Sequence, residues 1–378
     1  MNIINYLKKY QDTTFQEMPF NEIDSLILSE LSYMNLQMYA PSLEENKFVK
    51  LQTMRIFNEK NFSYGSVDAK QNLKMIELMK HGERFKTMQI GLCKEKVKEG
   101  DNATQFFGVT YILPTNELYI AFRGTDITIN GWKEDFNLAL MDTIPSQRDA
   151  LSYTKAVLKK HKGNFYIGGH SKGGNLAFYS AFNLDDKELE DRLIHAYSFD
   201  GPGFKNGVND FPSFKNIKDR ISKYMTHRDL VGMIYNNFRK EAIIIAATGI
   251  LLGGHDPFSW HVNLYKIRFV RARRAKGYRD GEIAFNKWVK TIKEEDKILA
   301  CDIIFDLLKD AKTVYDLPKV VGNILAHGKE ILAEYSDDEK ERILKIVKKL
   351  IKTYTNQAFN IKKKHKTAKK ELEVKYAE

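Results

Sequence analysis

The sequence predicts an α/β fold, in which a mostly parallel central sheet carries helices on both faces. Short apolar strand patterns alternate with helical stretches between residues 146 and 225, as in a parallel sheet whose strands are joined by crossover helices. Helical segments without strand patterns flank this region on both sides. We therefore expect an α/β body with helical additions at its N-terminal and C-terminal ends.

The N-terminal segment, residues 1–85, is predicted to be mostly helical and to pack on the body. Its clearest helix follows Asn21, a residue type that often caps a helix N-terminus. Apolar side chains recur at helical intervals along this helix: Phe20, Ile23, Leu26, Ile27, Leu31 and Met34. This spacing predicts one buried face.

The body, residues 86–286, is expected to hold the sheet. Its first two strand patterns are separated by a short turn that begins with proline, which is typical of a β-hairpin. A helical stretch then leads into a short buried strand, and strand and helix patterns alternate from there on. The strand patterns are residues 106–113, 118–122, 165–168, 196–199, 221–225 and 243–246.

The C-terminal extension, residues 287–378, shows helical patterns only. Ser336 and Glu339 have the spacing of a capping box, and an apolar stripe follows them on one face of the expected helix. Residues 339–378 carry a balance of +8 out of the chain's net charge of +11. We expect a basic, exposed tail that could contact an anionic membrane peripherally, although the apolar stripe could equally pack on the body.

Composition excludes several classes of protein. Of the 378 residues, 43% are hydrophobic, which is enough for a large core and too many for a disordered chain. The two cysteines, Cys93 and Cys301, lack C-x-x-C spacing, so neither a zinc cluster nor a disulfide framework is expected. The longest nearly apolar run, residues 242–253, is shorter than the roughly 20 residues of a membrane span. Residues 1–18 do not resemble a signal peptide, and we expect a cytoplasmic protein.

The element that carries chemistry is G-G-H-S-K-G-G-N-L-A at residues 168–177, directly after a strand and leading into a helix. It contains G-x-S-x-G, in which a serine lies on a sharp strand-to-helix turn that small neighbours make possible. Ser171 is therefore the predicted nucleophile, against the alternative of a glycine-rich turn with an incidental serine. The N–H of Lys172, at the start of the helix, could stabilise a developing oxyanion.

A nucleophilic serine needs a base, and the base needs a carboxylate that orients it. Asp229 follows the strand at residues 221–225 and is the preferred acid. Asp200, at the end of the preceding strand, is the alternative. His255 lies in a loop after the next strand and is the preferred base, with His261 as the alternative. The resulting order of Ser, Asp and His is the one expected of an α/β hydrolase.

A second oxyanion donor is expected in the loop after an earlier strand of the sheet. Residues 118–122 form such a strand, and Gly124 after it lets the backbone come close. Thr125 is the candidate, through its N–H or its hydroxyl. The alternative is that Thr125 merely caps the next helix.

These segments together resemble the class 3 (fungal-type) lipase branch of the α/β hydrolases. The resemblance rests on F-R-G-T at residues 122–125, on G-H-S-x-G-G-x-L-A, and on Thr-His shortly before Asp229. The fuller strings G-H-S-K-G-G-N-L-A, S-F-D-G-P-G-F and H-D-P-F-S-W resemble a bacterial lipase-like family described only as a domain of unknown function. The resemblance spans roughly residues 20–285. The site residues that it implies are Ser171, Asp229 and His255 as the triad, with Thr125 and Lys172 near the oxyanion.

The preferred function is hydrolysis of a carboxylic ester, of a small molecule or of a lipid such as a lysophospholipid, through an acyl-enzyme on Ser171. The alternative is a non-catalytic, lipase-like protein that acts as a binding or regulatory module. Nucleic-acid binding by the basic stretch at residues 266–274 is a weaker hypothesis, because no nucleic-acid-binding module accompanies the charge. The sequence holds no metal-binding or dinucleotide-binding motif, so no cofactor is expected. Neither the acyl chain nor the oligomeric state follows from these patterns.

Overall fold

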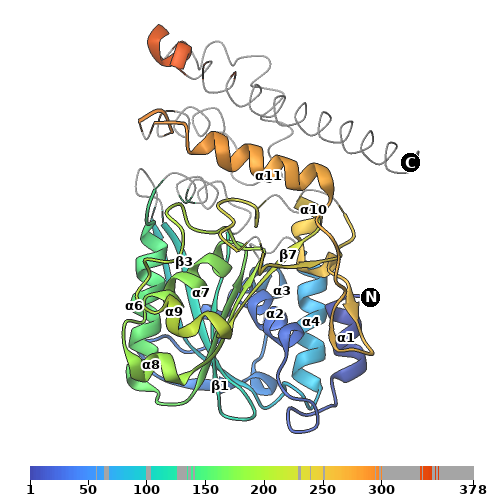
Figure 1. Ribbon diagram of the computed structural model, residues 1–378. Helices are drawn as coiled ribbons and strands as arrows, with labels where there is room; N and C mark the ends of the chain where they lie inside the picture. The colour runs from blue at the N-terminus through green and yellow to red at the C-terminus, as the bar shows by residue number, and fades with distance from the viewer. Residues whose placement is uncertain are drawn as a thin grey trace, which may run out of the picture. The chain divides into compact units, whose positions relative to one another are not determined.

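The computed structural model (Figure 1) describes residues 1–56, 58–63, 68–98, 104–125, 134, 138, 141–228, 231–238, 240–249, 252–293, 295–297, 299, 333, 335–342, 345 and 348. The chain forms two compact units. The first holds residues Met1–Arg274, and the second begins at Ala275. The three-part division of the chain at residues 85 and 286 stays a prediction.

An eight-stranded sheet forms the centre of the first unit, with its strands in chain order from β1 to β8. β1 to β4 pair antiparallel, and β4 to β8 pair parallel. The strands are β1 (Phe48–Lys50), β2 (Gln89–Lys98), β3 (Thr104–Ile112), β4 (Leu118–Phe122), β5 (Phe165–His170), β6 (Leu193–Phe199), β7 (Ile221–Thr226) and β8 (Ile243–Ile245). The predicted α/β fold class is confirmed, and each predicted strand pattern corresponds to an observed strand. β1 and β2 are additions that the sequence does not predict.

Side chains of the central strands alternate between two hydrophobic cores, one on each face of the sheet. In β4, Tyr119 and Ala121 belong to the first core, whereas Leu118, Ile120 and Phe122 belong to the second. All five side chains are buried. Because successive residues of a strand point to opposite faces, a strand with no exposed residue must be covered on both sides.

N-terminal helices cover the first face. These are α1 (Ile3–Tyr10), α2 (Glu22–Leu31) and α4 (Ala69–His81), and the short α3 (Glu59–Phe62) precedes α4. Asn21 begins α2 as the sequence predicts, because its side chain accepts from the N–H groups of Ile23 and Asp24, and Asp24 reciprocates. Figure 1 shows α1, α2 and α4 on one side of the sheet and α6 and α7 on the other.

The second face is covered by helices that connect the parallel strands. They are α6 (Pro145–Lys160), α7 (Lys172–Phe182), α8 (Lys187–Arg192) and α9 (Phe214–Ile217). The parallel strands follow one another in chain order, and crossover connections are almost always right-handed. All the crossover helices therefore lie on the same face, which leaves the other face for the N-terminal helices.

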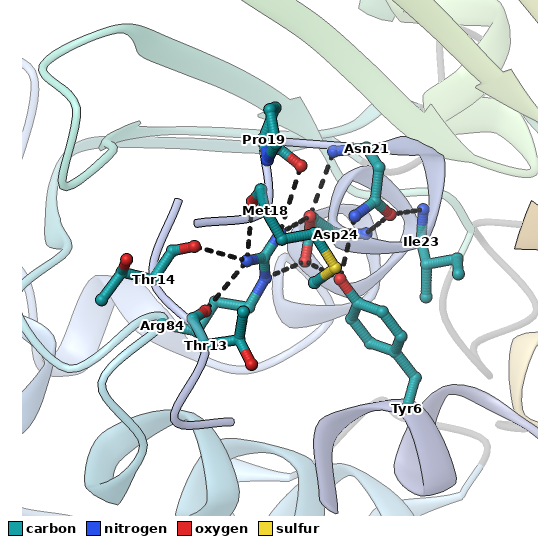
Figure 2. Close-up of polar contacts among 9 residues, drawn as sticks. All are labelled: Tyr6, Thr13, Thr14, Met18, Pro19, Asn21, Ile23, Asp24 and Arg84. Carbon is teal, nitrogen blue, oxygen red and sulfur yellow. Dashed lines mark hydrogen bonds and ion pairs between the residues drawn. The ribbon is translucent and has the colours of Figure 1, made fainter. Parts of the chain in front are cut away.

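A buried arginine ties the N-terminal helices together (Figure 2). Arg84 donates to both carboxylate oxygens of Asp24 at 2.8 and 2.5 Å, and neither side chain is exposed. It also donates to main-chain carbonyls of the segment before α2, and Tyr6 donates to Asp24 at 2.9 Å. Removing one partner of such a pair typically costs about 3–5 kcal/mol, because the other charge stays buried. This cluster fixes α1, α2 and the end of α4 against one another.

Short elements complete the first unit. They are the 3₁₀ turns η1 (Leu36–Met38), η2 (Leu51–Thr53), η3 (Lys218–Arg220) and η4 (Pro257–Ser259), helix α10 (Leu252–His255), and the hairpin strands β9 (Val262–Asn263) and β10 (Arg268–Phe269). α10 and η4 follow β8 and carry the candidate base, while the hairpin packs beside α1.

The second unit contains helix α11 (Lys276–Val289). Ser336 and Glu339 exchange the hydrogen bonds of the predicted capping box, with Glu339 N donating to Ser336 Oγ and Ser336 N donating to the Glu339 carboxylate. The whole of the predicted apolar stripe that follows, and all of residues 349–378, lie outside the described residues. Within the described part of the chain, no helix is long and apolar enough to cross a membrane.

Candidate active site

Ser171 lies on a strained turn between β5 and α7. Its backbone has φ 57° and ψ −133°, a conformation that residues other than glycine rarely adopt. The flanking glycines are required by close backbone approaches. A Cβ on Gly169 would lie 2.3 Å from the carbonyl carbon of Gly173, and a Cβ on Gly173 would lie 2.1 Å from the carbonyl oxygen of Phe122. The G-x-S-x-G spacing thus produces a tight elbow, with the serine at the end of a central strand.

His255 forms a hydrogen bond with Asp200. The distance between His255 Nδ1 and Asp200 Oδ2 is 3.0 Å, and the Asp200 side chain is fully buried. Asp200 follows β6 and also has a positive φ, of 54°. Its other oxygen, Oδ1, accepts from the N–H of Thr226 at the end of β7. The acid that pairs with the histidine here is therefore the one that the sequence analysis placed second, and Asp229 lies outside the described residues.

His170, the residue before the serine, also contacts His255. Its Nε2 lies 2.9 Å from the carbonyl oxygen of His255, and the two rings pack with their centroids 4.5 Å apart. Because a carbonyl only accepts, His170 Nε2 must carry a proton. On the far side of the ring, Nδ1 lies 3.1 Å from the hydroxyl of Tyr33, which follows α2. A side chain from the segment after α2 thus contacts the elbow and, through His170, is linked to the base.

No hydrogen bond joins the Ser171 hydroxyl to His255 among the described residues. Contacts between serine and base are often long without substrate and tighten when substrate binds. The elements that carry the two groups are nevertheless linked directly, because His170 lies next to Ser171 in the chain and bonds to His255.

The oxyanion candidates meet at the end of β4. A Cβ placed on Gly124 would lie 2.1 Å from the Tyr33 hydroxyl, 2.6 Å from the His170 carbonyl oxygen and 3.1 Å from Ser171 Cβ, so glycine is needed at this position. Thr125 follows immediately, and its Oγ1 is buried without a hydrogen-bond partner among the described residues. Lys172 begins α7, so its N–H belongs to the first turn, where main-chain donors have no partner within the helix. One buried hydroxyl and one helix N-terminus therefore flank the serine.

The Lys172 side chain has a role that the sequence does not reveal. Its ammonium is fully buried and lies 2.7 Å from Glu134 Oε2 and 2.9 Å from the carbonyl oxygen of Gln105. Glu134 is fully buried as well, and its carboxylate accepts from Ser146 and from the N–H of Gln105. This network joins the start of α7 to β3 and α6, and it holds the first turn of α7 in place.

The alternative histidine is engaged elsewhere. His261 Nε2 lies 2.6 Å from Thr248 Oγ1 at the surface of the unit. Burial, together with the charge of the chain's amino terminus, lowers the pKa of His261. The histidine ring that bonds to Asp200 is that of His255.

A second buried acid lies near the base. Burial raises the pKa of Glu30, on α2, to about 8, and the carboxylates of Asp256 and Asp68 contribute in the same direction. The hydrogen bond from Asn72 and the charge of His255 oppose this rise. Burial also raises the pKa of Asp256, next to His255. Within the described residues, no group of three or more His, Cys, Asp or Glu side chains could hold a metal ion.

A family model described as Mbeg1-like matches residues 79–306, more than half of the chain. The chain belongs to the Mbeg1-like family. The matched segment includes the elbow, Asp200, His255 and both oxyanion candidates. The expected membership of a lipase-like family is confirmed by this match.

A solved structure titled "Crystal structure of M37 lipase" is similar to this Mbeg1-like chain. It is 18% identical, with a TM-score of 0.37, and the match covers 58% of this chain and 72% of the other. No curated protein matches the chain.

Proposed function

We propose that this Mbeg1-like chain is a serine hydrolase that cleaves a carboxylic ester, of a small molecule or of a lipid such as a lysophospholipid. The observation that carries the proposal is a serine held in a strained elbow beside a hydrogen-bonded histidine–aspartate pair. Backbone strain of this kind costs about 1–3 kcal/mol and persists where the surrounding structure enforces it, most often at functional sites.

The proposed reaction is acyl transfer through an acyl-enzyme. Ser171 Oγ attacks the ester carbonyl carbon, and His255 Nε2 accepts the hydroxyl proton. The tetrahedral intermediate collapses when the bond to the leaving alcohol breaks, and His255 returns the proton to that alcohol. Water then attacks the acyl-enzyme by the same steps, which releases the carboxylic acid and regenerates the serine.

Asp200 is assigned the acid role in this proposal. Its carboxylate accepts from His255 Nδ1, which leaves Nε2 free of a proton and able to act as the base. The N–H of Thr226 supplies a second donor to the buried carboxylate, which helps to keep it ionised. Asp229, the acid that the family resemblance implies, is the competing assignment.

The oxyanion is assigned to two donors, the N–H of Lys172 and Thr125. A buried hydroxyl without a partner normally costs free energy, so the Thr125 side chain is suited to a partner that forms only during the reaction. The buried Glu134–Lys172 pair would keep the first turn of α7 aligned while charge develops on the substrate oxygen. The reaction draws on side chains and water and requires no cofactor.

Hydrolysis of a panel of p-nitrophenyl esters and lysophospholipids tests the proposal. Ser171→Ala should abolish turnover while the thermal unfolding transition is retained. His255→Ala should lower kcat by about 10³-fold or more, whereas His261→Ala, a matched control, should remain near wild type. A folded protein without turnover of any ester in the panel would favour the non-catalytic alternative, a binding or regulatory module.

A further inference from the structure

One face of the first unit is basic and contains no acidic residue in the two segments that form it. Residues 1–10 include Lys8 and Lys9 and no Asp or Glu. Residues 257–274 include five Lys or Arg and no Asp or Glu. The proposed hydrolase chemistry uses none of these cations.

The fold places these two segments side by side. The N–H of Val262, in β9, donates to the carbonyl oxygen of Met1 at 2.8 Å. At the other end of α1, the Tyr10 hydroxyl donates to the carbonyl oxygen of Leu264. Helix α1 therefore runs along the hairpin of β9 and β10, and Lys9 of the helix lies against Tyr265 of the hairpin.

Four cations define this surface, which we call the basic face: Lys8, Lys9, Lys266 and Arg268. All four side chains are exposed. No ion pair links any of them to a carboxylate among the described residues. Their positive charge is therefore available to an outside partner.

Exposed apolar and aromatic side chains accompany the charge. Six large hydrophobic residues are exposed in the described part of the chain, and three of them, Met1, Tyr265 and Val270, lie in these two segments. Tyr265 is 87% exposed at the tip of the hairpin, and the Lys9 ammonium lies 4.5 Å from the centre of its ring. Tyrosine beside lysine or arginine is the combination that proteins use at the boundary between lipid headgroups and acyl chains.

The turn at the tip of the hairpin has an unusual backbone conformation. Ile267 has φ 48°, which is unusual for a β-branched residue. Its side chain packs against the first hydrophobic core, while Tyr265 and Lys266 stay in solvent. Two bonds from the N–H groups of Tyr265 and Lys266 to the Asn263 side chain hold the turn closed. The packing of Ile267 and these two hydrogen bonds fix the conformation of the tip.

We propose that the basic face, with Tyr265 at its tip, docks on the surface of an anionic lipid bilayer. The charge of this surface and its exposed aromatic residue complement the anionic headgroups of a bilayer. This contact is separate from the predicted contact of the C-terminal tail. It goes beyond the proposed ester hydrolysis, since docking is measured without turnover.

The docking surface is joined to the loop of the candidate base. Asn2, which caps α1, donates to the carbonyl oxygen of Phe258 in η4, three residues after His255. A bilayer that holds α1 and the hairpin would therefore hold the segment on which His255 lies.

Sedimentation with vesicles of phosphatidylcholine containing phosphatidylserine as about one lipid in three tests this proposal on the full chain. The variant K8Q/K9Q/K266Q/R268Q should lower the vesicle partition coefficient by on the order of 100-fold, because each lysine or arginine near an anionic surface contributes to the free energy of binding. Tyr265→Ser should lower it several-fold, and Tyr265→Trp should preserve it. Wild-type binding should weaken steeply between low and high salt.

The matched control removes the same charge from the opposite side of the sheet. Lys155, Lys159, Lys215 and Lys218 are exposed on α6 and at α9 and η3, and K155Q/K159Q/K215Q/K218Q should bind vesicles like wild type. Figure 1 shows α6 and α9 on the other side of the sheet from α1. Equal losses in both variants, or no loss in the first, would overturn the proposal. Binding of a single-stranded RNA without binding of vesicles would reassign the basic face to nucleic acid.

Discussion

Asp200→Asn is the substitution that separates the two candidate acids. Asparagine has nearly the same shape as aspartate and can still accept from the N–H of Thr226. What it changes is the contact to His255. Asp200 Oδ2 lies 3.0 Å from Nδ1 and only accepts, whereas the amide group of asparagine can also donate.

The expected loss follows from the tautomer of His255. With a carboxylate at 3.0 Å, the ring proton stays on Nδ1, and Nε2 remains available to the serine. With an amide that donates to Nδ1, the proton moves to Nε2, and the ring cannot act as a base. The same change in a Ser-His-Asp triad lowers kcat by about 10⁴-fold, which corresponds to about 5.5 kcal/mol of transition-state stabilisation.

The assay is kcat and KM for the best ester of the panel at neutral pH, with Asp229→Asn as the matched control. Asp200→Asn should lower kcat with little change in KM, and thermal unfolding should show that the variant is folded. Asp229→Asn should stay within about tenfold of wild type, a far smaller loss than removal of a triad acid produces. The reverse ranking would refute the pairing of Asp200 with His255 in the working enzyme and would restore the acid that the family resemblance implies.

Three further predictions test other parts of the structure. Thr125→Val should lower kcat by about 10²-fold or more with KM little changed, because the buried Thr125 hydroxyl, which has no partner among the described residues, would be lost as an oxyanion donor. Thr125→Ser should retain most of the wild-type kcat. A valine variant with wild-type kcat would leave only the N–H of Thr125 as a donor. Folding raises the pKa of Glu30 from its ordinary value of 4.5 to about 8, so its contribution to stability is lost as pH rises from 4.5 to 8. Chemical denaturation should therefore show that Glu30→Gln gains stability over wild type at pH above 8 and converges with it toward pH 4.5; a constant difference would contradict this. Deleting residues 360–378 should weaken vesicle binding in a salt-dependent way and leave turnover of a soluble ester intact, whereas unchanged binding would remove the tail from membrane contact.

Local patterns predict the elbow and the core strands well, because their causes are local. Gly169 is needed for a backbone approach to Gly173 within the same turn, and this approach is implied by the G-x-S-x-G spacing itself. Gly173 is needed because the end of β4 comes close at Phe122, a contact that the spacing alone does not show. β4 is predictable because every residue in it is apolar and buried. Asn21 marks the start of α2 through bonds to residues two and three positions away.

Other features depend on contacts that no local pattern records. Asp200 and Asp229 both follow strands of the parallel half of the sheet, so position alone does not choose between them. The positive φ of Asp200 accompanies its contact with His255. β2 escapes prediction because its pairing with β3 shifts register between Gly91 and Lys94, which interrupts the period-two alternation of side chains.

The supporting residues of the site come from distant parts of the chain. Tyr33 reaches His170 across 137 positions, and Glu134 reaches Lys172 across 38. The sequence shows Tyr33 only as an aromatic residue after an amphipathic helix, and it predicts a role for the N–H of Lys172 but none for its side chain. The buried partner of Lys172 becomes evident only when β3, α6 and α7 are assembled.

The central claim is that Ser171 is an activated nucleophile, and the most direct measurement is the site of covalent modification by a fluorophosphonate probe. The full chain is incubated with the probe and digested, and the modified peptide is sequenced by mass spectrometry. We predict a single adduct on Ser171, absent from Ser171→Ala and formed far more slowly in His255→Ala than in His261→Ala. A folded protein that carries no adduct, or carries it on another residue, would contradict the account.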